Sequence, residues 1–119
     1  SVSDARKGLE MFRKVNVPIL GVIENMSKYS CSSCGHEEQI FGSDGGETLS
    51  KEYDVPLLAS FPLNKSIAIK ADTGKPSVIS DSEDDLSCLY RQAALAASCT
   101  LASEGRSYAQ VFPEIVVEN

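Results

Sequence analysis

Two stretches of the chain share one order, in which a helix-like segment leads into a Val-Pro pair and an uninterrupted apolar run. The first run is residues 17–24 (VPILGVIE), which follows an amphipathic segment over 3–15. The second is residues 55–62 (VPLLASFP), which follows a shorter helical segment over 46–53. Apolar runs without polar alternation are typical of parallel strands covered on both faces, and proline is tolerated where a strand opens. The repeated order predicts an open α/β sheet with right-handed crossovers.

The remaining helices are predicted from periodicity and composition. Leu49 and Tyr53 are expected to point inward from the second helix because they are four positions apart. A short helix is expected over 66–71 and a long, alanine-rich helix over 86–103. Gly105 is the expected stop signal of that last helix.

Two predicted strands are few for a parallel sheet, which normally has several strands and helices on both faces. The predicted helix over 3–15, at the start of the sequence, also has the character of a crossover helix between two strands. We therefore interpret it as the C-terminal part of a larger α/β domain whose central strands are encoded upstream.

Composition limits the classes of partner. The 119 residues carry 17 acidic and 11 basic side chains, a formal net charge of -6, and the basic residues are scattered. Nucleic acid and anionic membranes require clustered Lys and Arg, so neither is expected as a partner. No apolar run approaches the roughly 20 residues of a membrane helix, and no signal peptide is recognisable. We expect a cytoplasmic protein, in which cysteines are thiols or metal ligands rather than disulfides.

Cys31 and Cys34 form a C-x-x-C pair in residues 29–36 (YSCSSCGH). Three interpretations are open, namely metal or cluster ligands, a redox dithiol, and coincidence. A redox pair is expected at a helix N-terminus, which lowers the pKa of the first thiol. Here Gly35 follows the second cysteine, as in metal-binding knuckles, and residues 36–41 look like an extended return strand. His36 is either a third ligand or, as the spacing favours, a surface residue.

The other two cysteines do not complete this site. Cys88 and Cys99 are eleven residues apart on the predicted long helix, which places them on one face about 16 Å apart. They can form neither a disulfide nor a chelating pair, and we interpret them as small buried hydrophobic residues. If the C-x-x-C pair holds a cluster, it supplies half of a four-sulfur site, and a two-fold axis through it would supply the other half from a second copy.

The sequence resembles the Mrp/ApbC family of deviant P-loop ATPases, within the ParA/MinD-like superfamily, which carry iron-sulfur clusters. The resemblance covers residues 3 to about 80 in order and spacing. It is carried by residues 4–9 (DARKGL), 17–27 (VPILGVIENMS), the cysteine pair with Gly35, residues 40–42 (IFG) with Gly45 and Gly46, and residues 55–58 (VPLL) leading to Pro62 and Leu63. The step from ENMS to C-x-x-C is the most specific part.

The resemblance implies a fold, a cargo and partners. The fold would be the C-terminal part of a three-layer α/β/α P-loop domain, with a partial open parallel sheet and flanking helices. Cys31 and Cys34 would bind a 4Fe-4S cluster that bridges a homodimer, with zinc as an occasional substitute, and apo iron-sulfur proteins would receive the cluster. Asn25 matches the position that recognises adenine, and Pro62 and Leu63 match the loop beside the base. No catalytic residue is assigned.

One departure from the family pattern limits what this chain can do. The phosphate-binding loop ending in Gly-Lys-Ser/Thr does not occur, and residues 74–77 (GKPS) and 42–46 (GSDGG) are poor substitutes for it. We expect ATP and Mg²⁺ to bind the full-length protein, without ATP hydrolysis by this chain alone. The expected division is 1–80 for the α/β part, 81–104 for a C-terminal helix and 105–119 for a tail. A zinc-knuckle or redox-dithiol interaction module is the alternative function.

Overall fold

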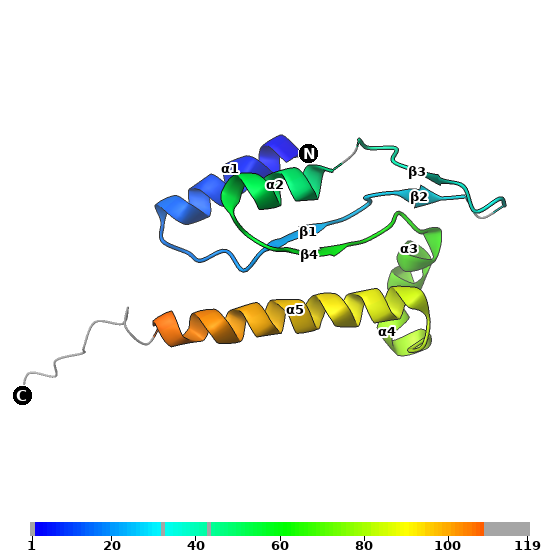
Figure 1. The fold of residues 1–119 in the computed structure, drawn as a ribbon. Coiled ribbons are helices and arrows are strands. Elements are labelled where there is room, and N and C mark those ends of the chain that lie inside the picture. Colours follow the sequence, from blue (N-terminus) through cyan, green and yellow to red (C-terminus); the bar gives the residue numbers. More distant parts are fainter. Residues whose placement is uncertain (1, 32, 43, 109–119) are drawn as a thin grey trace, which may run out of the picture.

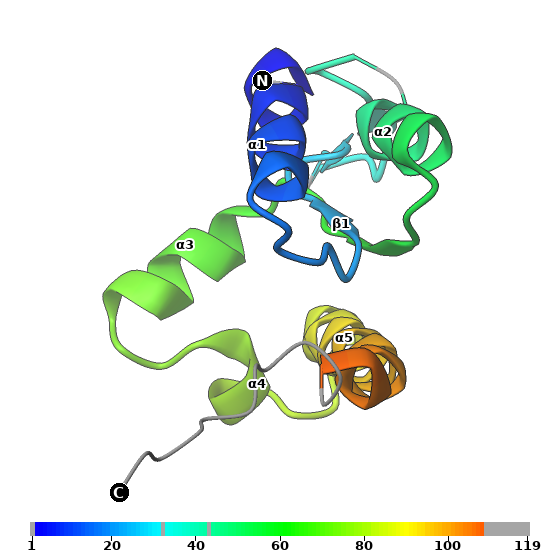
Figure 2. The same ribbon diagram turned by 90° about the vertical axis from the view of Figure 1, so that its left-hand side faces the viewer.

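Two parallel strands lie between layers of helices in the computed structural model, which describes residues 2–31, 33–42 and 44–108 (Figure 1). Strand β1 (Val22–Glu24) pairs with β4 (Leu57–Ser60). Figure 2 shows helices α1 (Val2–Lys14) and α2 (Gly45–Tyr53) on one side of these strands and α5 (Asp85–Tyr108) on the other. The predicted α/β class with a partial parallel sheet and flanking helices is confirmed.

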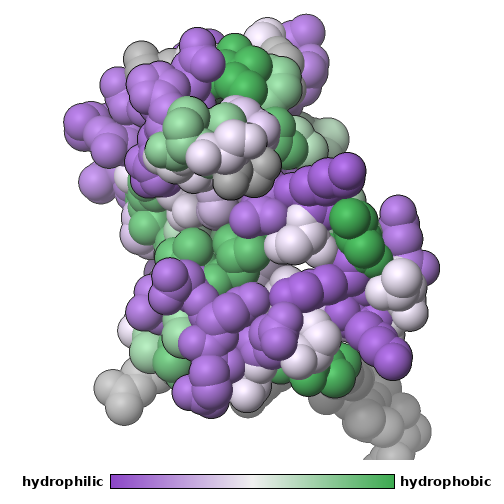
Figure 3. Space-filling model, turned by 90° about the vertical axis from the view of Figure 1, so that its right-hand side faces the viewer, coloured by the Kyte–Doolittle hydropathy of each residue, from purple (hydrophilic) through white to green (hydrophobic). Residues whose placement is uncertain are grey.

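Four further short elements lie within the described residues. Strands β2 (Tyr29–Ser30) and β3 (Glu37–Glu38) form an antiparallel hairpin between β1 and α2. Helices α3 (Lys65–Asp72) and α4 (Ser77–Ser80) connect β4 to α5. The hairpin projects from one end of the strands in Figure 1, and from that end the surface is mainly hydrophilic with separate hydrophobic patches (Figure 3).

The two predicted apolar strands are neighbours, as expected, but they are shorter and more open than the prediction. Val22 pairs with Leu57 and Glu24 with Ser60, with one irregularity between them. The expectation that both faces of the first strand are covered is wrong for the described chain, because Ile23 is 50% exposed. The physical reason is that β4 is the only strand beside β1 within the part of the chain that the structure describes.

The core lies between α1, α2 and the strands. Leu9 from α1 packs with Leu49 and Tyr53 from α2, and all three side chains are buried. The half-buried side chains around them are Ile19, Val22 and Val55. The inward orientation predicted for Leu49 and Tyr53 is confirmed. Burial of one such leucine stabilises the fold by about 1.5–3 kcal/mol.

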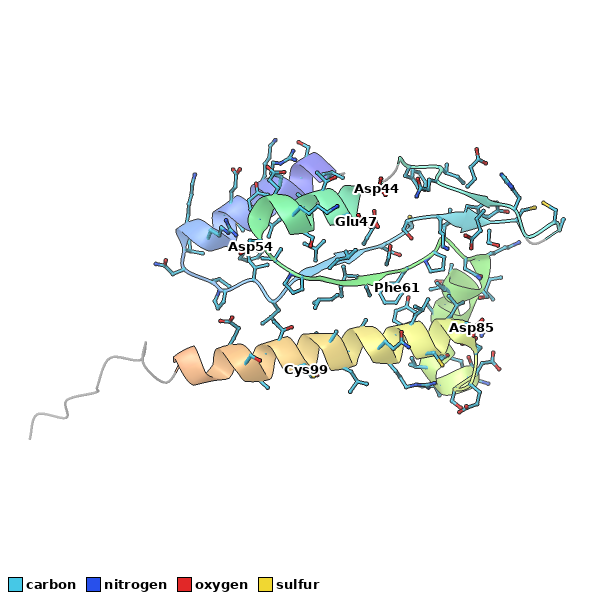
Figure 4. The ribbon with its side chains drawn as sticks, viewed as in Figure 1. Asp44, Glu47, Asp54, Phe61, Asp85 and Cys99 are labelled. Atoms are coloured by element: carbon cyan, nitrogen blue, oxygen red, sulfur yellow. The ribbon has the colours of Figure 1, made fainter. Side chains whose placement is uncertain are left out.

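A second contact holds α5 against the opposite side of the strands. The ring of Phe61, which follows β4, stacks on Tyr90 of α5 with 4.3 Å between ring centroids (Figure 4). Phe61 and Ala93 are both buried. This contact fixes the segment after β4, which borders the candidate site.

The C-terminal half departs from the prediction at two points. Helix α4 was not expected, because four residues carry too little periodicity to indicate a helix. Gly105 does not end α5, which continues to Tyr108. The strand composition predicted over 110–117 lies outside the described residues. In the described part of the chain, no helix combines the length and apolar character that crossing a membrane requires.

Candidate metal-binding hairpin and neighbouring base site

The cysteine pair occupies the turn of the β2–β3 hairpin. The backbone N–H of Cys31 donates to the carbonyl of His36 across 2.9 Å, and the N–H of Gly35 donates back to the carbonyl of Cys31 across 2.8 Å. Gly35 has a φ of +71°, a left-handed conformation that glycine adopts without strain. These bonds close a tight turn in which the two cysteines are three positions apart. The predicted turn is confirmed, whereas the return strand predicted over 36–41 is shorter, because only Glu37 and Glu38 pair with β2 and Ile40 and Phe41 lie in a turn.

The turn directs backbone donors at the first thiol. The N–H groups of Ser33 and Cys34, in that order, and then the Cys34 side chain lower the pKa of the Cys31 thiol. The thiolate is the form of cysteine that binds metal, so this arrangement favours the ligand form. Cys31 is half-buried and Cys34 is exposed, and both are free thiols. The hairpin therefore presents two sulfur ligands to the surface.

No third ligand joins the pair within the described residues. There, no group of three or more His, Cys, Asp or Glu side chains is arranged to hold a metal ion. His36 is exposed on the hairpin, so the geometry gives no support to its role as a third ligand. Two cysteines from one chain leave a four-sulfur site half complete.

The two cysteines of α5 do not contribute to this site, but their expected burial is wrong. Cys88 is half-buried, with Nη2 of Arg91 at 3.4 Å from its sulfur, and Cys99 is exposed on α5 (Figure 4). The reason is that α5 meets only β4 and α4 within the described chain, which leaves much of its circumference in solvent.

The three residues predicted for nucleotide-base binding lie at one edge of the sheet. Asn25 directly follows β1, and Pro62 and Leu63 follow β4, so parallel pairing brings their backbones together. Asn25 lines a groove of about 620 Å³ between α1, α2 and β1, whereas Pro62 and Leu63 do not. Its Oδ1 accepts the N–H of Met26 at 2.9 Å. The structure therefore places the three residues at one edge without enclosing them in one pocket.

Within the described residues, the two glycine-containing segments offer no free phosphate site. Pro76 of the 74–77 segment stands at the N-cap of the four-residue helix α4, and Ser77 is buried. In the 42–46 segment, the N–H of Gly46 at the start of α2 already donates to the Glu24 carboxylate. A carboxylate at that position would repel a phosphate.

Sequence reasoning gave no role of their own to two residues that shape this region. Glu24 and Ser27 both line the groove beside α1 and a second groove of about 390 Å³ near β4. Glu24 binds α2 and β4, and Ser27 binds the segment after β4. Glu24 ends β1 and Ser27 follows three residues later, and their place after a parallel strand is the signal that could have singled them out.

The fold and the cysteine hairpin define an α/β unit, with a parallel strand pair between helices, that carries a two-thiol site at its surface. A family model described as ParA, NUBPL iron-transfer P-loop NTPase, matches residues 1–97. The chain belongs to this family.

Similar proteins agree with that assignment. The chain is 52% identical over 92 residues to an iron-sulfur cluster carrier protein of Pseudomonas fragi, with 77% of this chain and 32% of that protein covered. It is 50% identical over 91 residues to the protein of that name in Escherichia coli K12, with 76% and 25% covered. It is 44% identical over 90 residues to the iron-sulfur cluster transfer protein NUBPL of Mus musculus, with 76% and 28% covered. The chain thus spans about a quarter to a third of the length of these relatives.

A solved structure supports the fold alone. A nucleotide-binding protein from Archaeoglobus fulgidus, solved in complex with ADP, superposes with a TM-score of 0.56. The two sequences are 22% identical, and the match covers 72% of this chain and 34% of the other.

Proposed function

We propose that this chain is the cluster-binding region of an iron-sulfur cluster carrier and that it passes its cluster to acceptor proteins. The observation that carries the proposal is the Cys31–Cys34 turn, in which backbone N–H groups lower the pKa of the Cys31 thiol. The family and the names of its relatives support the same activity. The acceptors are apo iron-sulfur proteins.

The cargo is a 4Fe-4S cluster shared by two copies of the protein. Each copy supplies Cys31 and Cys34, and a two-fold axis between the hairpins brings four thiolates together. A cluster held at an exposed interface can be loaded and released when that one interface opens. The homodimer is therefore part of the site rather than an accessory to it.

The full-length protein binds ATP with Mg²⁺. Asn25 suits recognition of an adenine ring, because an amide can pair with the base through its donor or acceptor group. Its NH₂ group is the better candidate, since its Oδ1 already accepts the N–H of Met26. The 119 residues contain no Gly-Lys-Ser/Thr loop, so the proposal assigns no hydrolysis to this chain alone. A cytoplasmic location, where its thiols stay reduced, suits this function.

Anaerobic reconstitution with ferrous iron and sulfide tests the proposal. Wild-type protein is expected to take up about four irons per two chains, to show cluster absorption, and to elute as a dimer. Cys31→Ser and Cys34→Ser are expected to lose the cluster, whereas Cys99→Ser, which removes an exposed cysteine of α5, is expected to keep it.

Two outcomes would overturn the proposal. The first is an absence of cluster absorption in the wild-type protein, or absorption that survives Cys31→Ser. The second is stoichiometric zinc bound by two sulfur ligands per chain in protein purified aerobically, which would support an interaction module instead.

A further inference from the structure

The hairpin that carries the cysteines has no packing support of its own. Strands β2 and β3 contact each other and no other helix or strand in the described part of the chain. A two-stranded hairpin alone is marginally stable in water. The Lys28–Glu37 ion pair at 2.8 Å links its two arms, but both side chains are about half exposed. The position of the cysteines therefore depends on where the hairpin joins the sheet.

The outgoing arm joins the sheet through backbone bonds to the segment after β4. The N–H and the hydroxyl of Ser27 both donate to the carbonyl of Phe61, across 3.0 and 3.1 Å. The N–H of Leu63 donates to the carbonyl of Lys28 across 2.7 Å, and Tyr29 forms a β-bridge with Leu63. We call residues 27–29 and 61–63 the latch.

One partner of the latch is rigid. Phe61 is buried and its ring stacks on Tyr90 of α5. Its carbonyl, which accepts both bonds from Ser27, is therefore held by the core. Ser27 is the one latch residue that reaches this fixed carbonyl with a side chain as well as its backbone.

We propose that Ser27 is a positioning residue for the cysteine pair: its hydroxyl fixes the hairpin to the Phe61 carbonyl and so sets how firmly the two thiols are held in place. This proposal rests on the proposed function, because holding the two thiols in place matters only if they bind the cluster. A site shared between two copies requires its ligands within about half an ångström of their places. Because the hairpin alone is only marginally stable, a loosened latch lets it open more often, which frees the two thiols and weakens the grip on the cargo.

Hydrogen exchange in the metal-free protein tests the latch directly. The amides of Cys31 and Gly35 close the turn, so their exchange reports opening of the hairpin. Loss of the Ser27 hydroxyl in Ser27→Ala is expected to speed their exchange about fivefold, the effect of one hydrogen bond. Ser27→Thr keeps the hydroxyl and is expected to restore the wild-type rate.

Ser50→Ala is the matched control. The Ser50 hydroxyl donates to the carbonyl of Val55 across 2.6 Å, at the loop that enters β4. This variant loses the same kind of bond away from the hairpin, so it is expected to lower global stability and to leave the exchange of both turn amides unchanged. The proposal is overturned if Ser27→Ala exchanges like the wild type, if Ser50→Ala accelerates the turn amides equally, or if the wild-type amides exchange as in an unfolded chain.

Cluster retention is the second readout. In reconstituted protein, Ser27→Ala is expected to lose its cluster absorption to a chelator about fivefold faster than wild type and Ser50→Ala. If wild-type protein assembles no cluster, the proposed function fails while the exchange experiment still decides the latch. If the cluster assembles and Ser27→Ala retains it as the wild type does, the latch fails and the carrier function stands.

Discussion

Oε1 of Glu24 accepts a hydrogen bond from the backbone N–H of Gly46 across 3.2 Å, so the last residue of β1 caps the first turn of α2. The residue at the N-cap position, Asp44, has a φ of 61° and makes no capping bond with its side chain. A carboxylate at a helix N-terminus is favoured by the helix dipole. Oε2 of Glu24 also accepts a hydrogen bond from the hydroxyl of Ser60, across 2.9 Å. One side chain thus joins β1, α2 and β4.

The close approach of Glu24 predicts that Gly46→Ala destabilises the protein by about 1–3 kcal/mol. An added Cβ would lie 2.9 Å from Cβ of Glu24 and 3.0 Å from Cδ1 of Leu57. Gly8→Ala is the control, because a Cβ at that position of α1 meets nothing within 4 Å. It is expected to stabilise the protein by about 0.5–1 kcal/mol through helix propensity. Urea unfolding measures both, and a Gly46→Ala variant as stable as wild type would contradict the prediction.

The core predicts a large cost for Leu49→Ala. The Leu49 side chain is 3% exposed between α1, α2 and the strands, so its truncation leaves a cavity and is expected to cost about 2–5 kcal/mol. Leu95→Ala removes the same atoms from a side chain that is 65% exposed on α5 and is expected to change stability by less than about 0.5 kcal/mol. Equal unfolding midpoints for the two variants would show that the α1–α2 layer is not the core.

The features that could be predicted from the sequence are those that a local residue pattern determines. The two Val-Pro strands and the helices before them follow from periodicity, and Leu49 and Tyr53 point inward as their spacing requires. The C-x-x-C turn was equally readable, since glycine after the second cysteine and an extended return segment are local signals.

What could not be predicted depends on tertiary contacts. The Glu24–Gly46 and Ser27–Phe61 bonds join residues 22 and 34 positions apart, and no local pattern indicates such pairs. The stop expected at Gly105 failed because a glycine only favours a helix end without enforcing it. The exposure of Cys99 depends on how much of the length of α5 is covered by neighbouring elements. The periodicity of the sequence carries no information on that coverage.

A charged cluster ties α3 to the start of α5. The ammonium of Lys70 lies 2.6 Å from a carboxylate oxygen of Asp81 and 3.4 Å from one of Asp84. Hydrogen bonding from Ser87, whose N–H donates to Asp84 at 2.7 Å, and then the Lys70 charge lower the pKa of Asp84. Its folded-state pKa therefore lies below the ordinary value of about 3.9. The stabilisation is fully present above about pH 4 and is lost as the pH falls through the folded-state pKa.

Asp84→Asn tests this dependence. The difference in urea midpoint between wild type and Asp84→Asn is expected to be largest near neutral pH and to shrink below about pH 4. Asp72→Asn, at the exposed last residue of α3, is the control and is expected to change the urea midpoint only slightly at neutral pH. An Asp84→Asn difference that stays constant from pH 7 to pH 2.5 would exclude the ionised carboxylate as the source of the stabilisation.

The last prediction compares backbone strain introduced in the cysteine turn with the same backbone strain introduced between α3 and α4. Gly35 and Gly74 both have a φ of +71°, and a Cβ at either would meet nothing within 4 Å. Alanine at either position therefore introduces the same left-handed strain, about 1–2 kcal/mol, and no steric clash. Gly74 lies between α3 and α4, whereas Gly35 donates to the carbonyl of Cys31 inside the turn.

We therefore expect Gly35→Ala to lose a reconstituted cluster to a chelator about five- to thirtyfold faster than wild type, because the strain is relieved by opening the turn that holds the thiols. Gly74→Ala is expected to lower the thermal midpoint and to retain the cluster like wild type. Chelator kinetics and thermal unfolding on both variants make the comparison. Equal cluster loss from the two would mean that global stability, and not the geometry of the Cys31–Cys34 turn, controls retention.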